Sequence, residues 1–381
     1  MRFGVLLLTL CAASCCLGQQ TGVSPLPADP HAILAAAQPL YDFSSTDLKP
    51  WHLRVTYQLY NEKEAPTEQG TFEYWWASPE VHRSSWTRSN VSYTTWEVAG
   101  HGHAHQGSSE ELSYAESKLE QILFSPMPSQ RTVNSDHTQL EKRTFGKDAN
   151  MLQCVMVGPK MTGLDTAQIG LFPTYCFAPS QPALLAYFEY TAPIMEFNQT
   201  SKVQGRYLPK QIAILSYAHK KLLTAAVEMV NGISPQDAAL APPQDVKISY
   251  PAKKVKEDEA KDSAASQDQS NAAKGLVALG DDGQPSVVIP TEEANKLGLK
   301  RPAPIYPQDA KDARISGTVV IRAVIGRDGW VHDMQVVTAP SASLAASALG
   351  AVSQWRYRPY LLNGEPVEVD TTANVIYSLG P

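Results

Sequence analysis

The strictest pattern in this chain is an alternation of apolar and polar residues close to its C-terminus. From Val367 to Leu379 every second side chain is apolar except Thr371, and the positions between them are polar except Ile376. A period of two places the two sets on opposite faces of a β-strand, so this segment predicts a long strand with one buried face. Such a strand needs neighbouring strands and a second layer to cover that face.

Two further strands and a helix are predicted before this strand. The strands would extend the sheet, and the helix would supply the second layer. Thr318 to Ile325 alternates, and the turn Arg327-Asp328-Gly329 leads into a second strand from Trp330 to Thr338. Glycine provides the positive φ that a tight hairpin requires. Apolar residues then recur at helical spacing from Leu344 to Trp355, which predicts a helix packed on the sheet.

The order strand, strand, helix, strand resembles the C-terminal domain of the TonB energy-transducer family. The resemblance spans residues 301–381 and implies a small β-β-α-β domain. In that family the domain binds a short extended peptide, the TonB box of an outer-membrane receptor, as a strand added to its last strand. Pairing at an open strand edge supplies the affinity. The residues that carry the resemblance are Tyr306-Pro307, Gly317, Asp328-Gly329, Ala351-Val352, Trp355-Arg356-Tyr357 and Pro359.

The resemblance implies a partner-binding site on the last strand. Trp355 and Tyr357 are expected in the core, and Arg356 and Arg358 are expected to be solvated or paired with acids of a partner. A typical transducer also has an uncleaved membrane helix and a long proline-rich segment. We recognise neither in this sequence and therefore expect docking to an envelope protein rather than transmission of force. The implied binding residues are Thr371, Thr372, Ala373, Asn374, Val375, Ile376 and Tyr377.

Residues 31–245 predict a larger domain of aromatic-rich antiparallel strands. Alternating segments occur at His52 to Tyr60, Gly70 to Trp76 and Val91 to Val98, and Glu110 to Leu123 has helical spacing. Further strands are expected at Met151 to Val157, Tyr175 to Ala178, Ala186 to Tyr190, Ile212 to Tyr217 and Leu222 to Met229.

A long curved antiparallel sheet around a short helix is similar to the half-barrel of the LolA and LolB lipoprotein carriers. The resemblance implies a concave face that binds an apolar ligand such as an acyl chain. In a simpler interpretation, the tryptophans of these strands fill or cover the sheet core: Trp75, Trp76, Trp86 and Trp96. The predicted fold class is α+β, with this curved sheet at the N-terminus and the TonB-like domain at the C-terminus.

The segment 253–274 separates the two predicted domains. It consists mainly of Lys, Glu, Asp, Ala, Ser and Gln and contains no aromatic residue. Such a composition cannot bury enough apolar area to offset the entropy lost on ordering, so we expect a disordered charged linker.

The N-terminus predicts export to the periplasm. Residues 1–18 combine Arg2 with a short apolar run, which is typical of a signal peptide and too short to span a membrane. Two outcomes stay open: cleavage after Gly18, or lipid attachment at Cys15. The net charge of −6 gives no reason to expect nucleic acid as a partner. The oligomeric state is open between a monomer and a dimer.

Cleavage after Gly18 would leave two cysteines in the mature chain, Cys154 and Cys176, which are 22 residues apart. An even pair in an exported protein favours a disulfide, with two buried free thiols as the alternative. His101, His103 and His105 would share one face of a strand and could bind Zn²⁺ or Cu²⁺, but the flanking glycines favour an exposed loop. No metal, cofactor or catalytic motif is expected, so the chain is predicted to be a binding protein rather than an enzyme.

Overall fold

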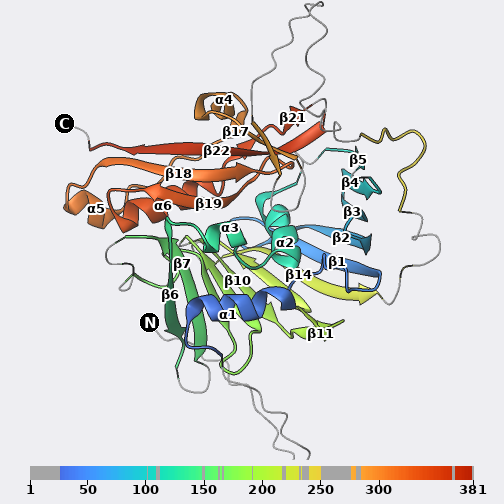
Figure 1. Cartoon of the computed structure of the whole chain (residues 1–381), viewed down its shortest axis with the longest axis horizontal. Coiled ribbons are helices and arrows are strands. Elements are labelled where there is room, and N and C mark those ends of the chain that lie inside the picture. The colour runs from blue at the N-terminus through green and yellow to red at the C-terminus, as the bar shows by residue number, and fades with distance from the viewer. Residues whose placement is uncertain are drawn as a thin grey trace, which may run out of the picture.

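The computed structural model describes residues 26–379, apart from 101, 109–111, 148–150, 162–163, 165–166, 191, 217–219, 231–232, 234–239, 250–275, 280–284 and 363–364. A large N-terminal sheet and a smaller C-terminal sheet dominate the fold (Figure 1). The predicted signal peptide with Cys15 and the predicted linker 253–274 lie outside the described residues. Among the helices that are described, none has the length and apolar character needed to cross a membrane.

The N-terminal sheet has twelve strands in the order β5-β4-β3-β2-β1-β14-β13-β10-β9-β8-β7-β6. Two antiparallel meanders meet where β1 pairs with β14, and a small hairpin of β11 and β12 lies apart from them. The strands are β1 Trp51–Tyr60, β2 Pro66–Ser78, β3 Val81–Arg88, β4 Val91–Val98, β5 Gly102–Gln106, β6 Thr138–Phe145, β7 Leu152–Pro159, β8 Thr174–Phe177, β9 Leu184–Glu189, β10 Ala192–Asn198, β11 Ser201–Val203, β12 Arg206–Leu208, β13 Gln211–Leu215 and β14 Lys221–Val230.

Short helices complete this domain: α1 (Pro30–Ala37), η1 (Gln38–Leu40), α2 (Tyr114–Phe124) and α3 (Gln130–Val133). A capping box fixes the start of α2, because Ser113 and Glu116 each accept a hydrogen bond from the backbone N–H of the other. The apolar side of α2 packs with β1, β2 and β3 in one core, to which Leu119, Phe72 and Trp86 contribute. The predicted α+β class with a curved antiparallel N-terminal sheet is confirmed. All four tryptophans named above are buried.

The C-terminal sheet has the order β15-β16-β22-β18-β19, with β21 also paired to β22. The predicted β-β-α-β core is confirmed as β18, β19, α6 and β22. The sheet also includes β15 and β16, which precede the predicted domain start at Arg301. The elements are β15 Leu276–Leu279, β16 Pro285–Val288, α4 Thr291–Lys296, β17 Gly298–Lys300, α5 Gln308–Asp312, β18 Gly317–Ile325, β19 Val331–Thr338, α6 Ala342–Val352, β20 Arg356–Tyr357, β21 Tyr360–Leu362 and β22 Glu365–Tyr377.

Gly329 closes the hairpin between β18 and β19, as the sequence predicted. Its φ is +83°, and a Cβ at this position would lie 2.1 Å from the carbonyl oxygen of Tyr357. Both the backbone conformation and the close approach therefore require glycine. The turn also contacts the N-terminal domain, because Ser117 Oγ on α2 donates a hydrogen bond to Asp328 Oδ2 at 3.1 Å.

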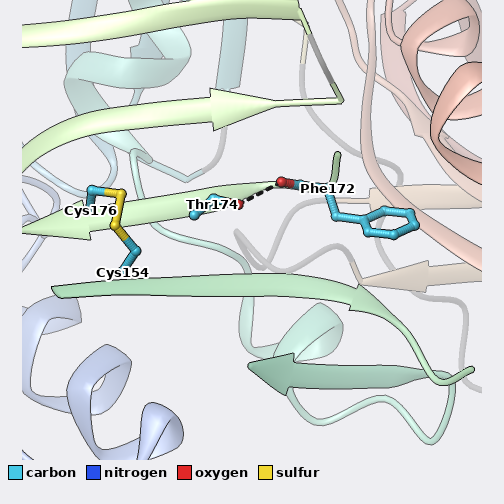
Figure 2. The surroundings of a disulfide bond; sticks show 4 residues. All are labelled: Cys154, Phe172, Thr174 and Cys176. Carbon is cyan, nitrogen blue, oxygen red and sulfur yellow. Dashed lines mark hydrogen bonds between the residues drawn. A yellow bond between two sulfur atoms is a disulfide. The ribbon is translucent and has the colours of Figure 1, made fainter. Parts of the chain in front are cut away.

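The two sheets share a continuous apolar core. Met156, Phe172 and Tyr190 of the N-terminal domain belong to the same buried cluster as Leu344 and Leu349 of α6. Figure 2 shows Phe172 with its ring directed towards the C-terminal elements, while Thr174 Oγ1 donates to its carbonyl oxygen at 2.8 Å. Because apolar side chains of both domains are buried together, the C-terminal sheet is fixed in place rather than freely tethered.

Arg356 corrects an expectation from the sequence, because it is buried with only 7% of its surface exposed. Its Nη1 donates to the carbonyl oxygen of Leu112 at 2.8 Å, and its Cζ lies 4.5 Å from the centre of the Trp330 ring. That ring packs edge-on against Tyr114 at the start of α2. The local pattern could not reveal this role, since it depends on a second domain lying against the helix-to-strand junction. Trp355 and Tyr357 are buried, as predicted.

Replacing Phe172 with alanine tests the shared core. Phe172 is fully buried, so Phe172→Ala should lower the free energy of unfolding by about 3–4 kcal/mol through lost burial and the cavity left behind. Phe145→Ala is the matched control, because that ring is 45% exposed, and it should cost less than about 1 kcal/mol. Chemical denaturation followed by fluorescence measures both. Two separate unfolding transitions in the unmodified chain would contradict a shared core.

A pair of acidic groups lies where the hairpin turn meets α2. Burial, followed by the negative charge of Asp328, raises the pKa of Glu120 to about 7. The protonated carboxyl therefore favours the folded state. Its contribution is fully present below the ordinary pKa of 4.5 and is lost as the pH rises through about 7.

Glu120→Gln should remove this pH dependence. Between pH 4.5 and pH 8, the free energy of unfolding of the unmodified protein should fall relative to that of Glu120→Gln by on the order of 1–3 kcal/mol. Denaturation curves at several pH values measure the difference, with Glu80→Gln at an exposed turn as the control. Parallel profiles for the unmodified protein and Glu120→Gln would show that the carboxyl titrates normally.

Candidate functional site

Strand β22 carries every predicted partner-binding residue, and one of its two sides is fully occupied. β18 pairs antiparallel with it from Val369 to Tyr377, with no break in the register. The candidate site therefore depends on the opposite side of β22.

That opposite side is covered in the middle of the strand, where β16 pairs in parallel with residues 368–370. The cover continues past β16, because Ile289 N–H donates to the carbonyl of Asp370 at 3.1 Å and Thr291 Oγ1 donates to the carbonyl of Thr372 at 2.6 Å. Of the strands that the structure describes, none pairs with residues 373–377 on this side.

The backbone groups that this uncovered side presents follow from the strand geometry. The carbonyls of Asp370 and Thr372 point away from β18, as their hydrogen bonds show. In an unbroken strand every second residue directs its N–H and C=O to the same side. Asn374 and Ile376 therefore present their backbone donors and acceptors at the open edge. Those of Ala373, Val375 and Tyr377 pair with β18.

The side chains around this edge divide between the two faces of the sheet. Ala373, Val375 and Tyr377 are buried on the face that packs with α6. Tyr306 packs edge-on against Tyr377 with 5.2 Å between ring centres, and its hydroxyl donates to the carbonyl of Ile315 at 2.6 Å. On the other face Asn374 is exposed, and Ile376 is 73% exposed. A large exposed apolar side chain beside an open edge is suited to contact with another chain.

The structure narrows the site predicted from the sequence. The sequence implied binding along residues 371–377, but Ile289 and Thr291 cover the outer side of the strand as far as Thr372. Thr371 Oγ1 donates to the carbonyl of Ile289 at 3.0 Å, and the carbonyl of Thr372 is occupied by Thr291. Ala373, Asn374, Val375, Ile376 and Tyr377 remain beside the uncovered edge.

Ion pairs at Asp370 connect the middle of β22 to β18 and to α3. Arg322 of β18 binds both carboxylate oxygens of Asp370, at 3.1 and 2.9 Å, and Arg131 of α3 binds the same carboxylate. Although burial opposes it, hydrogen bonding to Arg322 and Arg131 lowers the pKa of Asp370 below its ordinary value. This cluster connects β22 to α3 of the N-terminal domain.

The other edge of the C-terminal sheet, on β19, faces the N-terminal domain. β19 lies beside β7 and α3, and Gln335 Nε2 donates to the carbonyl of Arg131 at 3.2 Å. Figure 1 shows this arrangement: β19 faces the N-terminal domain, and β22 lies on the far side of β18. The β19 edge is thus covered, whereas the end of β22 beyond Thr372 is not covered by any strand in the described part of the chain.

The concave N-terminal sheet, expected to offer an apolar ligand site, is largely filled by its own side chains. A cavity of about 90 Å³ remains next to the C-terminal domain, lined in part by Ile122, Tyr175, Tyr187, Met195 and Met334. A wider and more open depression of about 780 Å³ has Thr and Gln residues as half of its lining, including Thr56, Gln58, Gln69, Gln211 and Thr224.

Those remaining candidate residues that the structure describes lie away from the open edge. Cys154 and Cys176 face each other on β7 and β8, and the structure joins them by a disulfide (Figure 2). His103 Nδ1 hydrogen bonds to Glu97 Oε1 at 2.8 Å, and His105 lies on the same strand, whereas His101 and Cys15 lie outside the described residues. Within the described part of the chain, no three His, Cys, Asp or Glu residues are grouped to hold a metal ion.

Comparison with known proteins separates the chain into two parts. Residues 302–379 match the family model described as Gram-negative bacterial TonB protein C-terminal. The solution structure of the Pseudomonas aeruginosa TonB C-terminal domain shares 27% identity, with 22% of this chain and 86% of that chain covered and a TM-score of 0.20. No curated protein sequence matched.

The N-terminal part is similar to other solved structures. A LolA superfamily protein from Nitrosomonas europaea covers 57% of this chain and 99% of its own, with 8% identity and a TM-score of 0.36. A putative outer membrane lipoprotein-sorting protein domain from Vibrio parahaemolyticus covers 55% and 97%, with 7% identity and a TM-score of 0.33. Residues 302–379 therefore match the TonB C-terminal family, and the chain also shows a distant structural similarity to a LolA superfamily protein.

Proposed function

We propose that this chain is a periplasmic envelope protein whose C-terminal domain binds an extended segment of an outer-membrane receptor. The observation that carries the proposal is the edge of β22 at Asn374 and Ile376, which no strand in the described part of the chain covers. The family match over residues 302–379 supports it, because TonB C-terminal domains interact with outer-membrane receptors. Binding would add a strand to the sheet, with the backbone supplying affinity and side chains supplying selectivity.

The proposed role is docking rather than chemistry or the transmission of force. The C-terminal sheet is fixed to the N-terminal domain through β19, α6 and Arg356. A partner bound at β22 would therefore be held at a defined position relative to the N-terminal sheet. Export through the predicted signal peptide, with cleavage after Gly18 or lipid attachment at Cys15, would place the chain in the compartment where such receptors are reached.

Carriage of an apolar ligand by the N-terminal domain is the second candidate function. The apolar part of the 90 Å³ cavity lining favours it. However, an engineered cavity of about 150 Å³ holds no more than a benzene-sized molecule. An acyl chain would require the domain contacts around Met334 and Phe172 to open. Docking at β22 requires no such rearrangement.

Proline at Asn374 tests the proposed edge. Asn374→Pro removes an outward-facing N–H and should weaken binding of a TonB-box peptide by at least tenfold, since strand addition loses a hydrogen bond and meets the proline ring. Asn374→Ala keeps the N–H and should bind within about threefold of the unmodified protein. Isothermal titration of the full chain with the same peptide measures all three.

Val375→Pro separates an effect on binding from an effect on folding. Its N–H faces β18, so proline there should disrupt the internal sheet and lower the thermal midpoint, whereas Asn374→Pro should leave the midpoint nearly unchanged. Equal binding by Asn374→Pro and the unmodified protein would rule out this edge as the docking site. Failure of every TonB-box peptide to bind would reject the proposed function.

A further inference from the structure

The segment from β16 to α4 occupies the same side of β22 on which a partner strand would have to lie. β16 pairs with residues 368–370, and Thr291, the first residue of α4, holds the carbonyl of Thr372. Figure 1 shows α4 standing over the middle of β22, with the C-terminal part of the strand beyond it. An added strand therefore meets the chain itself at Thr372.

We propose that this segment, residues 285–296, sets the length and position of the bound partner by leaving a slot at residues 373–377. The inference rests on the proposed function and specifies the ligand as a short extended peptide of about five residues. At roughly 3.3 Å per residue the slot is about 17 Å long. Longer partners would leave their additional residues in solvent or would have to displace β16.

The slot predicts what the partner must supply. The N–H and C=O groups of Asn374 and Ile376 offer few backbone hydrogen bonds, each of small net value, and association itself opposes binding. Side-chain burial must provide much of the remainder. Ile376, which is 73% exposed, is the large apolar side chain at this position. The partner should place an apolar side chain against it.

The occupant we infer is an extended segment of another protein and not a second folded copy of this chain. A specific interface between folded proteins buries at least about 1,000 Å². Five strand residues with one strongly exposed apolar side chain provide much less contact than this. A peptide gains most of its contacts within the slot, whereas a folded copy would need additional surface.

The length dependence of binding tests the slot. The probes are end-blocked synthetic peptides of five, seven and nine residues, taken from one TonB box and centred on the same apolar residue. With the full chain, isothermal titration should show measurable binding already at five residues and a change in affinity of less than threefold on extension to nine. A rise of tenfold or more between five and nine residues would overturn the inference, because the edge would then extend past Thr372.

Two pairs of variants make the test specific. Ile376→Asp should weaken the five-residue peptide by at least tenfold, and Ile376→Val should stay within threefold; binding unaffected by Ile376→Asp would contradict the side-chain assignment. Val287 is buried and Val288 is 43% exposed on β16. Val287→Asp should release β16 and let the nine-residue peptide gain at least fivefold over the five-residue one, whereas Val288→Asp should behave like the unmodified protein.

The outcomes distinguish this inference from the proposed function. If no peptide binds, both fail. If peptides bind with an affinity that grows with length, docking stands and the slot is wrong. Sedimentation equilibrium of the full chain should give a monomer; a dimer that Ile376→Asp dissociates would show that a second copy occupies the edge, and would overturn the partner assigned here. If Val287→Asp fails to fold, the peptide-length series and the two Ile376 variants still test whether the slot limits the partner.

Discussion

One edge of the C-terminal sheet is buried against the N-terminal domain, and this burial limits where a partner strand could be added to the sheet. β19 lies against β7 and α3, and Gln335 and Arg356 each donate a hydrogen bond to a carbonyl of the first domain. Because this edge is covered, strand addition at the proposed site uses the opposite side of β22, where β16 pairs with residues 368–370. The residues that remain beside the open edge follow from this cover.

The N-terminal sheet holds the C-terminal domain in place, and its own side chains fill most of its concave face. Its concave face is filled by α2 and by aromatic side chains such as Phe72 and Trp86. The cavity left beside Met334 is too small for an acyl chain. Instead, Phe172 and its neighbours extend the core into the C-terminal domain. The proposed function therefore rests on the open edge of β22.

Local periodicity made much of the fold predictable. The alternation on β18 and β22, the glycine of the hairpin turn and the apolar stripe of α6 identified the C-terminal core from the sequence. β15 and β16 were missed because strands of four residues are too short to show a reliable period. The limits of the open edge were missed for another reason. They depend on contacts between residues far apart in sequence, such as Thr291 with Thr372 and Arg131 with Asp370, which no local pattern encodes.

Amide hydrogen exchange across β22 in the full chain tests the central claim most directly, because it distinguishes residues on one strand by the direction of their N–H groups. The amides of Asn374 and Ile376 should exchange quickly. Those of Ala373, Val375 and Tyr377, which pair with β18, should be strongly protected. Equal protection at all five positions would mean that the edge is covered in the free protein. Fast exchange at all five would mean that this half of β22 is not part of a stable sheet, and either result would contradict an open docking edge.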